Sequence, residues 1–251
     1  MKHSTLVAVL ATAGLTLVST SAMAAVNLEA GIDAKSAYTS TGRTFNDGFV
    51  LQPWFDIDGL KVGDYELPIL FEFWANWDMH ECEEDPTIRK GRFQEIDLEL
   101  DWNLPNFGDE KFSWTVGLVE YFYPQGGWTT DRLVVLRAGY DCLLSPSVGL
   151  KYFYDGDSRR KYEAWAKVKH GFTFDEDTGF GLELSADLWY VQNINGLEDG
   201  LACADFSATL SYEIAYVGAT YIWRLDDDVL PNGFGWYDAK WVWSAGVSYS
   251  F

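Results

Sequence analysis

Acidic side chains recur at every second position in one stretch of the chain. Glu95, Asp97, Glu99 and Asp101 alternate there with isoleucine and leucine. Successive residues of a β-strand point to opposite faces of the sheet. The spacing therefore predicts a column of four carboxylates on one face, which could attract cations or pair with basic groups.

More charged residues fall on the same face of later alternating segments. Two readings of the combined set remain open. Opposed acidic and basic stripes would set a field across a pore, which discriminates solutes by charge. Alternatively, the groups pair with one another and, together with inward aromatic rings, fill the interior. The further charged positions are Arg137, Lys151, Lys167, Lys169, Glu183 and Asp187, and the inward aromatic positions are Phe93, Tyr121, Phe153, Trp165 and Trp189.

Twelve alternating segments, separated by turn residues, must position these side chains. Connections after odd segments are mostly long and polar, while those after even segments are mostly short. This parity is typical of an up-and-down barrel with both termini in the periplasm. We predict twelve strands, with ten or fourteen left open: 26–38, 48–58, 66–79, 92–104, 111–123, 131–143, 148–155, 161–172, 180–192, 204–214, 217–225 and 240–251.

The last segment indicates what surrounds the barrel. Trp241, Trp243, Val247 and Tyr249 alternate with small or polar residues up to the terminal Phe251. Aromatic residues at both ends of an apolar strand face are typical of contact with lipid and headgroups. A terminal aromatic residue resembles the signal that directs bacterial outer-membrane barrels to their assembly machinery. We therefore predict an all-β, transmembrane, up-and-down antiparallel barrel.

The first 24 residues read as a signal peptide, with a basic head, a short apolar run and an A-x-A site at Ala22-Met23-Ala24. The expected domain spans residues 25–251. It contains no apolar run of helical-span length, which excludes a helical inner-membrane protein. Without the one lysine of the signal, 17 basic and 38 acidic side chains remain, a net charge of −21. Such a surface is a poor partner for nucleic acid and for anionic lipid headgroups. The excess of acidic residues serves either solubility or a preference for cations, and both readings stay open.

Other chemistries find little support. His80 and His170 are the only histidines after processing, and no serine can be placed beside them, so we expect no enzyme. No phosphate-binding loop or zinc spacing is present. The acidic runs 81–85 and 226–228 lack defined ligand spacing, so we expect no cofactor and no metal. Cys82 and Cys203 both fall in expected outer loops and are the favoured disulfide pair.

Several motifs resemble those of bacterial outer-membrane barrels of the porin type, in particular TorF-like porins. The resemblance runs through residues 25–251 and implies a channel without identifying its cargo. This chain departs from the family where members typically carry an aromatic-Arg-Gly-like sequence in the first hairpin; it has Ser40-Thr41-Gly42-Arg43 there. The matching stretches are Tyr38–Arg43 with Leu51-Gln52-Pro53, Trp74–Met79, Leu143–Ser147 and Val247–Phe251.

We expect a narrow, passive channel for small polar solutes, with a preference for cations, in the outer membrane of a Gram-negative-type bacterium. The alternative is a non-conducting barrel that serves structure or surface contacts. The expected partners are outer-membrane lipid, lipopolysaccharide and the barrel-assembly machinery.

Overall fold

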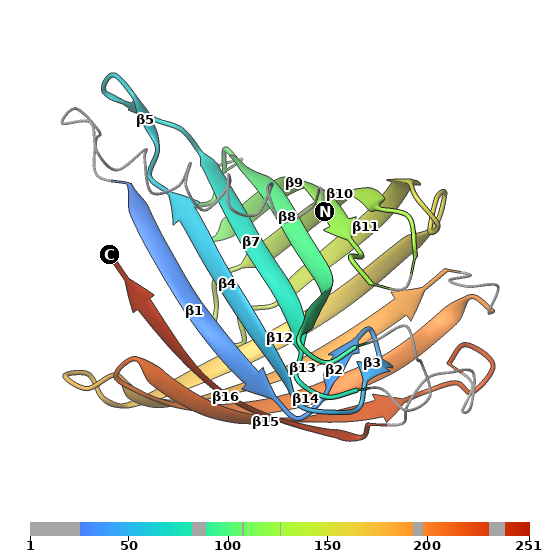
Figure 1. The fold of residues 1–251 in the computed structure, drawn as a ribbon. Helices are drawn as coiled ribbons and strands as arrows, with labels where there is room; N and C mark the ends of the chain where they lie inside the picture. Colours follow the sequence, from blue (N-terminus) through green and yellow to red (C-terminus); the bar gives the residue numbers. More distant parts are fainter. Residues whose placement is uncertain (1–25, 82–88, 107, 126, 193–197, 231–238) are drawn as a thin grey trace.

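The computed structural model describes residues 26–81, 89–106, 108–125, 127–192, 198–230 and 239–251, and these form sixteen strands (Figure 1). None of the described residues forms a helix long and apolar enough to cross a membrane. The strands are β1 (Asn27–Lys35), β2 (Tyr38–Ser40), β3 (Arg43–Asn46), β4 (Val50–Asp58), β5 (Lys61–Val62), β6 (Tyr65–Glu66), β7 (Ile69–Asp78), β8 (Arg92–Leu104), β9 (Phe112–Phe122), β10 (Asp131–Tyr140), β11 (Ser147–Asp155), β12 (Tyr162–Asp175), β13 (Phe180–Val191), β14 (Gly200–Tyr212), β15 (Ala215–Arg224) and β16 (Trp241–Ser250).

Twelve of these strands form one closed antiparallel barrel, in the order β1, β16, β15, β14, β13, β12, β11, β10, β9, β8, β7 and β4. Closure brings the first barrel strand beside the last, with Ile32 of β1 opposite Val247 of β16. Each strand otherwise pairs with its neighbour along the chain, skipping only the small hairpins. The predicted all-β, up-and-down barrel of twelve strands is confirmed.

The apolar faces of the strands point outward, away from the barrel. In β8, Trp102 is 55% exposed while its neighbour Asp101 is only 5% exposed. In the closing strand, Trp241, Trp243 and Tyr249 are exposed and Val242 is buried. A water-soluble barrel would place its apolar face inside, because burial of apolar surface drives its folding. The observed arrangement is the one that lipid contact favours.

Leu118, at the centre of β9 and 53% exposed, provides a test of this surface. On a lipid-facing surface, Leu118→Arg should lower the free energy of unfolding by about 2–4 kcal/mol. On a water-facing surface, the same change would stay within about 0.5 kcal/mol. Denaturant unfolding in phospholipid vesicles measures the difference.

Val62→Arg is the control for this test, because Val62 is also exposed but lies in the small β5–β6 hairpin outside the barrel. A neutral effect of Leu118→Arg in vesicles would contradict lipid contact at β9.

A β-bulge changes one predicted orientation. Asn76 of β7 lies opposite Glu95, but its neighbour Trp77 lies opposite Phe93, so Gln94 is an extra residue in β8. Gln94 and Glu95 are both buried on the inside, and Phe93 packs on the exposed Trp77 with ring centroids 5.7 Å apart. The prediction that Phe93 points inward is therefore wrong, because simple alternation cannot anticipate the bulge.

The position predicted for Cys203 is also wrong. Cys203 lies within β14 rather than in an outer loop, where it is a buried free thiol. Cys82, its expected disulfide partner, lies outside the described residues, as does the predicted signal peptide.

The small β2–β3 hairpin, which lies in the connection between β1 and β4, is not predicted from the sequence. Residues 40–47 are expected from sequence to be a polar outer loop, but β2 and β3 pair and fold back at the end of the barrel opposite the C-terminus (Figure 1). Thr41 and Gly42 at the turn both have positive φ, 51° and 77°. Positive φ at both central residues is the geometry of a two-residue type I′ hairpin, and Gly adopts it without strain. We refer to this end of the barrel as the mouth.

Candidate functional site

The four carboxylates of the β8 column all lie on the inner side of the wall, and Arg137 reaches two of them from β10. Its guanidinium donates to Glu99 at 2.5 Å and to Asp101 at 2.9 Å. Gly117 of the intervening strand β9 makes this possible, because a Cβ there would lie 2.3 Å from the Asp101 carboxylate. The mouth half of the column, Glu95 and Asp97, forms no salt bridge among the described residues, although the Lys151 ammonium lies close enough to interact with both carboxylates.

The three lysines predicted to point inward, Lys151, Lys167 and Lys169, also pair with acids on neighbouring strands. The Lys151 ammonium lies 3.8 Å from Glu163, that of Lys167 lies 3.6 Å from Asp187, and that of Lys169 lies 3.4 Å from Glu183. Arg137 of β10 reaches the acids of β8 across β9, and the lysines of β11 and β12 pair with acids of β12 and β13. This local pairing is the arrangement that the second reading, mutual pairing of the charges, describes.

The tip of the β2–β3 hairpin is bonded to β12, which lies far from β1 and β4 in the order of the barrel strands. Arg43 of β3 donates to Glu163 of β12 at 2.6 Å, and both side chains are nearly inaccessible, at 10% and 3% exposure. Arg43 also donates to Thr41 across the turn. Arg224 of β15 donates to the Gly42 carbonyl at 3.0 Å. These contacts fix the tip of the hairpin to β12 and β15, which are far from β2 and β3 in the sequence.

The base of the hairpin is held by a second set of polar contacts. The Tyr38 hydroxyl donates to Glu95 at 2.5 Å, and the Asn46 amide donates to Asp78 at 2.8 Å. Gln125 donates to the other oxygen of Asp78 at 3.0 Å. Burial, reinforced by the Glu95 carboxylate, raises the pKa of the Tyr38 phenol well above its usual value. Tyr38 is therefore a permanent hydrogen-bond donor to Glu95.

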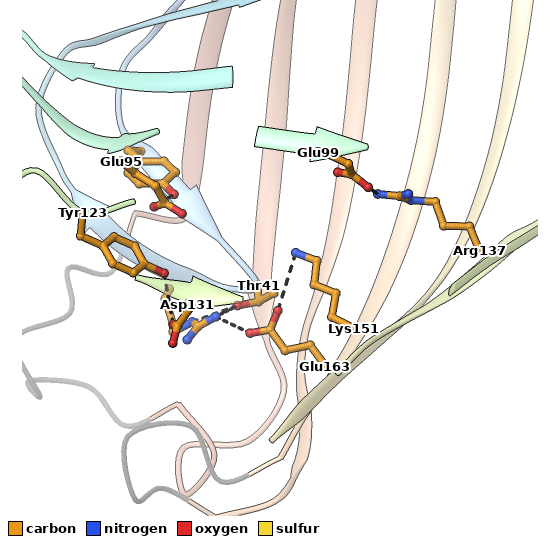
Figure 2. Close-up of polar contacts among 10 residues, drawn as sticks. Thr41, Glu95, Glu99, Tyr123, Asp131, Arg137, Lys151 and Glu163 are labelled. Carbon is orange, nitrogen blue, oxygen red and sulfur yellow. Dashed lines mark hydrogen bonds and ion pairs between the residues drawn. The ribbon is translucent and has the colours of Figure 1, made fainter. Parts of the chain in front are cut away.

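Between the hairpin and the wall lies a cavity of about 310 Å³, which we call the mouth cavity. Tyr123, just beyond β9, donates to Asp131 at 3.3 Å at its edge (Figure 2). Burial, with Glu95 and Asp131 nearby, raises the pKa of the Tyr123 phenol. The lining residues are Tyr38, Thr39, Ser40, Arg43, Phe45, Trp74, Glu95, Asp97, Tyr121, Tyr123, Trp128, Asp131, Lys151, Phe153, Asp157, Ser158 and Glu163.

Aromatic rings narrow the barrel beside the mouth cavity. Trp165 of β12 stacks on Trp189 of β13 with centroids 5.3 Å apart. The Trp165 ring also covers Gly149 of β11, where a Cβ would approach the ring to 2.0 Å. Tyr121 and Phe153 pack into a cluster next to it. These inward aromatic positions follow the predicted alternation.

The absence of a side chain at Gly149 should therefore matter for stability. Gly149→Ala is expected to lower the free energy of unfolding by about 1–3 kcal/mol through overpacking against Trp165. Gly171→Ala in β12 is the matched control, because nothing lies within 4 Å of a Cβ there. Denaturant unfolding in detergent or vesicles measures both. Equal effects of the two substitutions would contradict the packing of Trp165 on Gly149.

Among the residues that the structure describes, one group of acids lies close enough together to share a metal ion. Single oxygens of Glu72, Glu99 and Asp101 all lie within 4.8 Å of one another. Arg137 already neutralises two of them, which leaves little reason for a cation to bind there. Of the acidic runs considered from sequence, residues 82–85 lie outside the described residues, and Asp226 accepts from the Asp228 backbone in a local turn.

Sequence reasoning missed the residues that shape the mouth. Arg43 and Tyr38 act through a hairpin that was not predicted, and Glu163 gains its importance only from contact with Arg43. The Thr41-Gly42 dipeptide, flanked by residues able to form strands, was the available signal for the turn.

Comparisons with known proteins agree with this architecture. No family model and no curated protein matches the chain. The KdgM porin has a similar structure, with a TM-score of 0.51 and 12% identity, covering 90% of this chain and 99% of that chain. The NanC porin gives 0.49 at 12% identity over 90% and 99%, and Salmonella typhi OmpF in complex with daunomycin gives 0.36 at 9% over 90% and 97%.

The fold is that of a porin-type barrel. At 12% identity the likeness to KdgM is evidence for the fold alone, and it does not single out TorF-like porins.

Proposed function

We propose that the protein is an outer-membrane porin, a narrow passive channel for small polar solutes with a preference for cations. In this proposal the apolar outer face lies in lipid, β16 carries the contact with the assembly machinery, and the mouth faces outward, where lipopolysaccharide surrounds it. The channel needs neither a cofactor nor chemistry.

One observation supports the proposal most strongly: charge in the mouth is unbalanced. Four carboxylates of the mouth cavity, Glu95, Asp97, Asp131 and Asp157, form no salt bridge among the described residues. Both bases of the cavity, Arg43 and Lys151, pair with the same acid, Glu163. A narrow opening lined by excess negative charge attracts cations and repels anions.

A liposome-swelling series tests whether solutes pass and how large they can be. Vesicles containing the folded protein should swell quickly in a monosaccharide, more slowly in a disaccharide and hardly at all in a trisaccharide. Vesicles with unfolded protein give the background. No swelling above background in any solute would remove the channel proposal.

A second function, a non-conducting barrel, is favoured by one observation. The hairpin that crosses the mouth is fixed by a nearly inaccessible ion pair and by hydrogen bonds at its tip and base. If this hairpin closes the barrel completely, the protein would serve envelope structure or surface contacts. The swelling series separates the two functions.

A further inference from the structure

The mouth cavity has the size of a binding site for a small molecule. Its volume of about 310 Å³ lies at the lower end of the range of ligand pockets. Its lining comes from the β2–β3 hairpin, from β7 to β12 and from the connections after β9 and β11.

The polar groups of this cavity are arranged for a cation. Asp97 has a buried carboxylate oxygen without any hydrogen-bond partner in the described structure. Glu95 accepts from a neutral phenol, that of Tyr38, and its other close side-chain contact is the Asp97 carboxyl. Asp131 accepts from Tyr123 and from the Ser158 backbone, which are also neutral donors. Lys151 acts on Glu95 and Asp97 from a distance but forms its salt bridge with Glu163. Desolvated carboxylates that form no salt bridge gain most from a ligand that supplies positive charge in direct contact.

The remaining walls are aromatic, with Tyr121, Tyr123, Trp128 and Phe153 among them. Aromatic faces attract cations within about 6 Å of the ring centroid. The protein already uses this contact, because the Lys151 ammonium lies 5.5 Å from the Tyr121 ring centroid and 5.6 Å from that of Trp189. Rings also accept methylene groups, which a bare metal ion lacks.

We propose that the mouth cavity binds small organic cations carrying primary ammonium groups on an aliphatic chain. This inference rests on the proposed function and names the solute class that the channel favours. The ammonium groups pair with the carboxylates Glu95 and Asp97, and the methylene groups lie against the rings. Dianions are disfavoured, because both basic groups of the cavity are already paired with Glu163.

Three four-carbon compounds test the charge requirement at constant length: 1,4-diaminobutane, 4-aminobutanoate and succinate. Titration calorimetry of the folded protein in a non-ionic detergent at fixed ionic strength should give the tightest binding for the diamine, weaker binding for the zwitterion and none for the dianion. Equal binding of all three, tighter binding of succinate, or no binding of the diamine would each overturn the inference.

Substitutions locate the site. Asp97→Asn is expected to weaken diamine binding about tenfold, through loss of one charge-assisted contact. Trp128→Leu should weaken it without any change in charge. Glu29→Gln, an equal change of charge in β1 at the other end of the barrel, should leave it unchanged. Equal weakening by Glu29→Gln and Asp97→Asn would mean attraction to the net charge alone and would overturn the site.

The two proposals fail in different measurements. Diamine binding in detergent does not depend on conduction, whereas potassium chloride current across a bilayer does not depend on diamine binding. A protein that conducts potassium chloride but does not bind the diamine would overturn only the inference of a cation-binding cavity. A protein that binds the diamine but does not conduct would overturn only the proposal that the barrel is a channel.

Discussion

Arg43→Ala is expected to release the β2–β3 hairpin from the far wall and to raise the single-channel conductance by about twofold or more, because the hairpin obstructs the mouth. The substitution breaks a nearly inaccessible ion pair with Glu163. Removal of one partner of such a pair costs about 3–5 kcal/mol. That cost corresponds to about a hundredfold or greater increase in detachment of the hairpin.

Cys203 gives a second measure of the same release. Its thiol is buried beneath the turn, where a Cβ on Gly42 would lie 2.8 Å from the Cys203 Cβ. In a background with Cys82 and Cys142 replaced by serine, a maleimide should label Cys203 slowly in the native sequence and much faster in Arg43→Ala.

Lys61→Ala is the control for both measurements. It breaks the exposed Lys61–Glu66 pair of the β5–β6 hairpin, far from the mouth, and should change neither conductance nor labelling. If Arg43→Ala left both at the native level, the hairpin would not be the constriction.

The second large effect concerns charge selectivity. Replacing Glu95, Asp97 and Glu99 with glutamine, asparagine and glutamine removes three negative charges from the β8 column. It also leaves Arg137 with Asp101 as its only acidic partner of the column. The lumen near β8 then becomes more positive, so we expect most of the cation preference to disappear.

The reversal potential under a potassium chloride gradient measures this change directly. Glu120→Gln is a suitable control, because Glu120 pairs with Arg132 on the opposite face of the wall from Val119 and Tyr121. It should leave the reversal potential unchanged. If the triple variant kept the native reversal potential, the β8 column would not determine selectivity.

The barrel was predictable because its signal is local and repeated. Each strand must separate an apolar outer face from a polar inner face, so alternation in the sequence reports both the strand and its orientation. The closing strand and β8 show this most clearly, and both lie within a residue or two of their predicted bounds.

The arrangement within the barrel depends on contacts that alternation does not encode. Arg137 reaches Glu99 and Asp101 only because β9 has a glycine at position 117 between them. Phe93 points outward rather than inward because β8 contains one extra residue at the bulge. The pairing of Arg43 with Glu163 joins residues 120 positions apart, through a loop whose polar composition resembles any outer loop. The register of the strands and the direction of the loops are set by tertiary contacts. The positions of the charged side chains in the mouth depend on both.

The folded native protein in a planar lipid bilayer tests the central claim most directly. We predict discrete single-channel steps in potassium chloride, with a reversal potential that favours potassium. Repeated insertion of folded barrel without any current steps would show that water and ions do not cross the lumen, and would contradict the account.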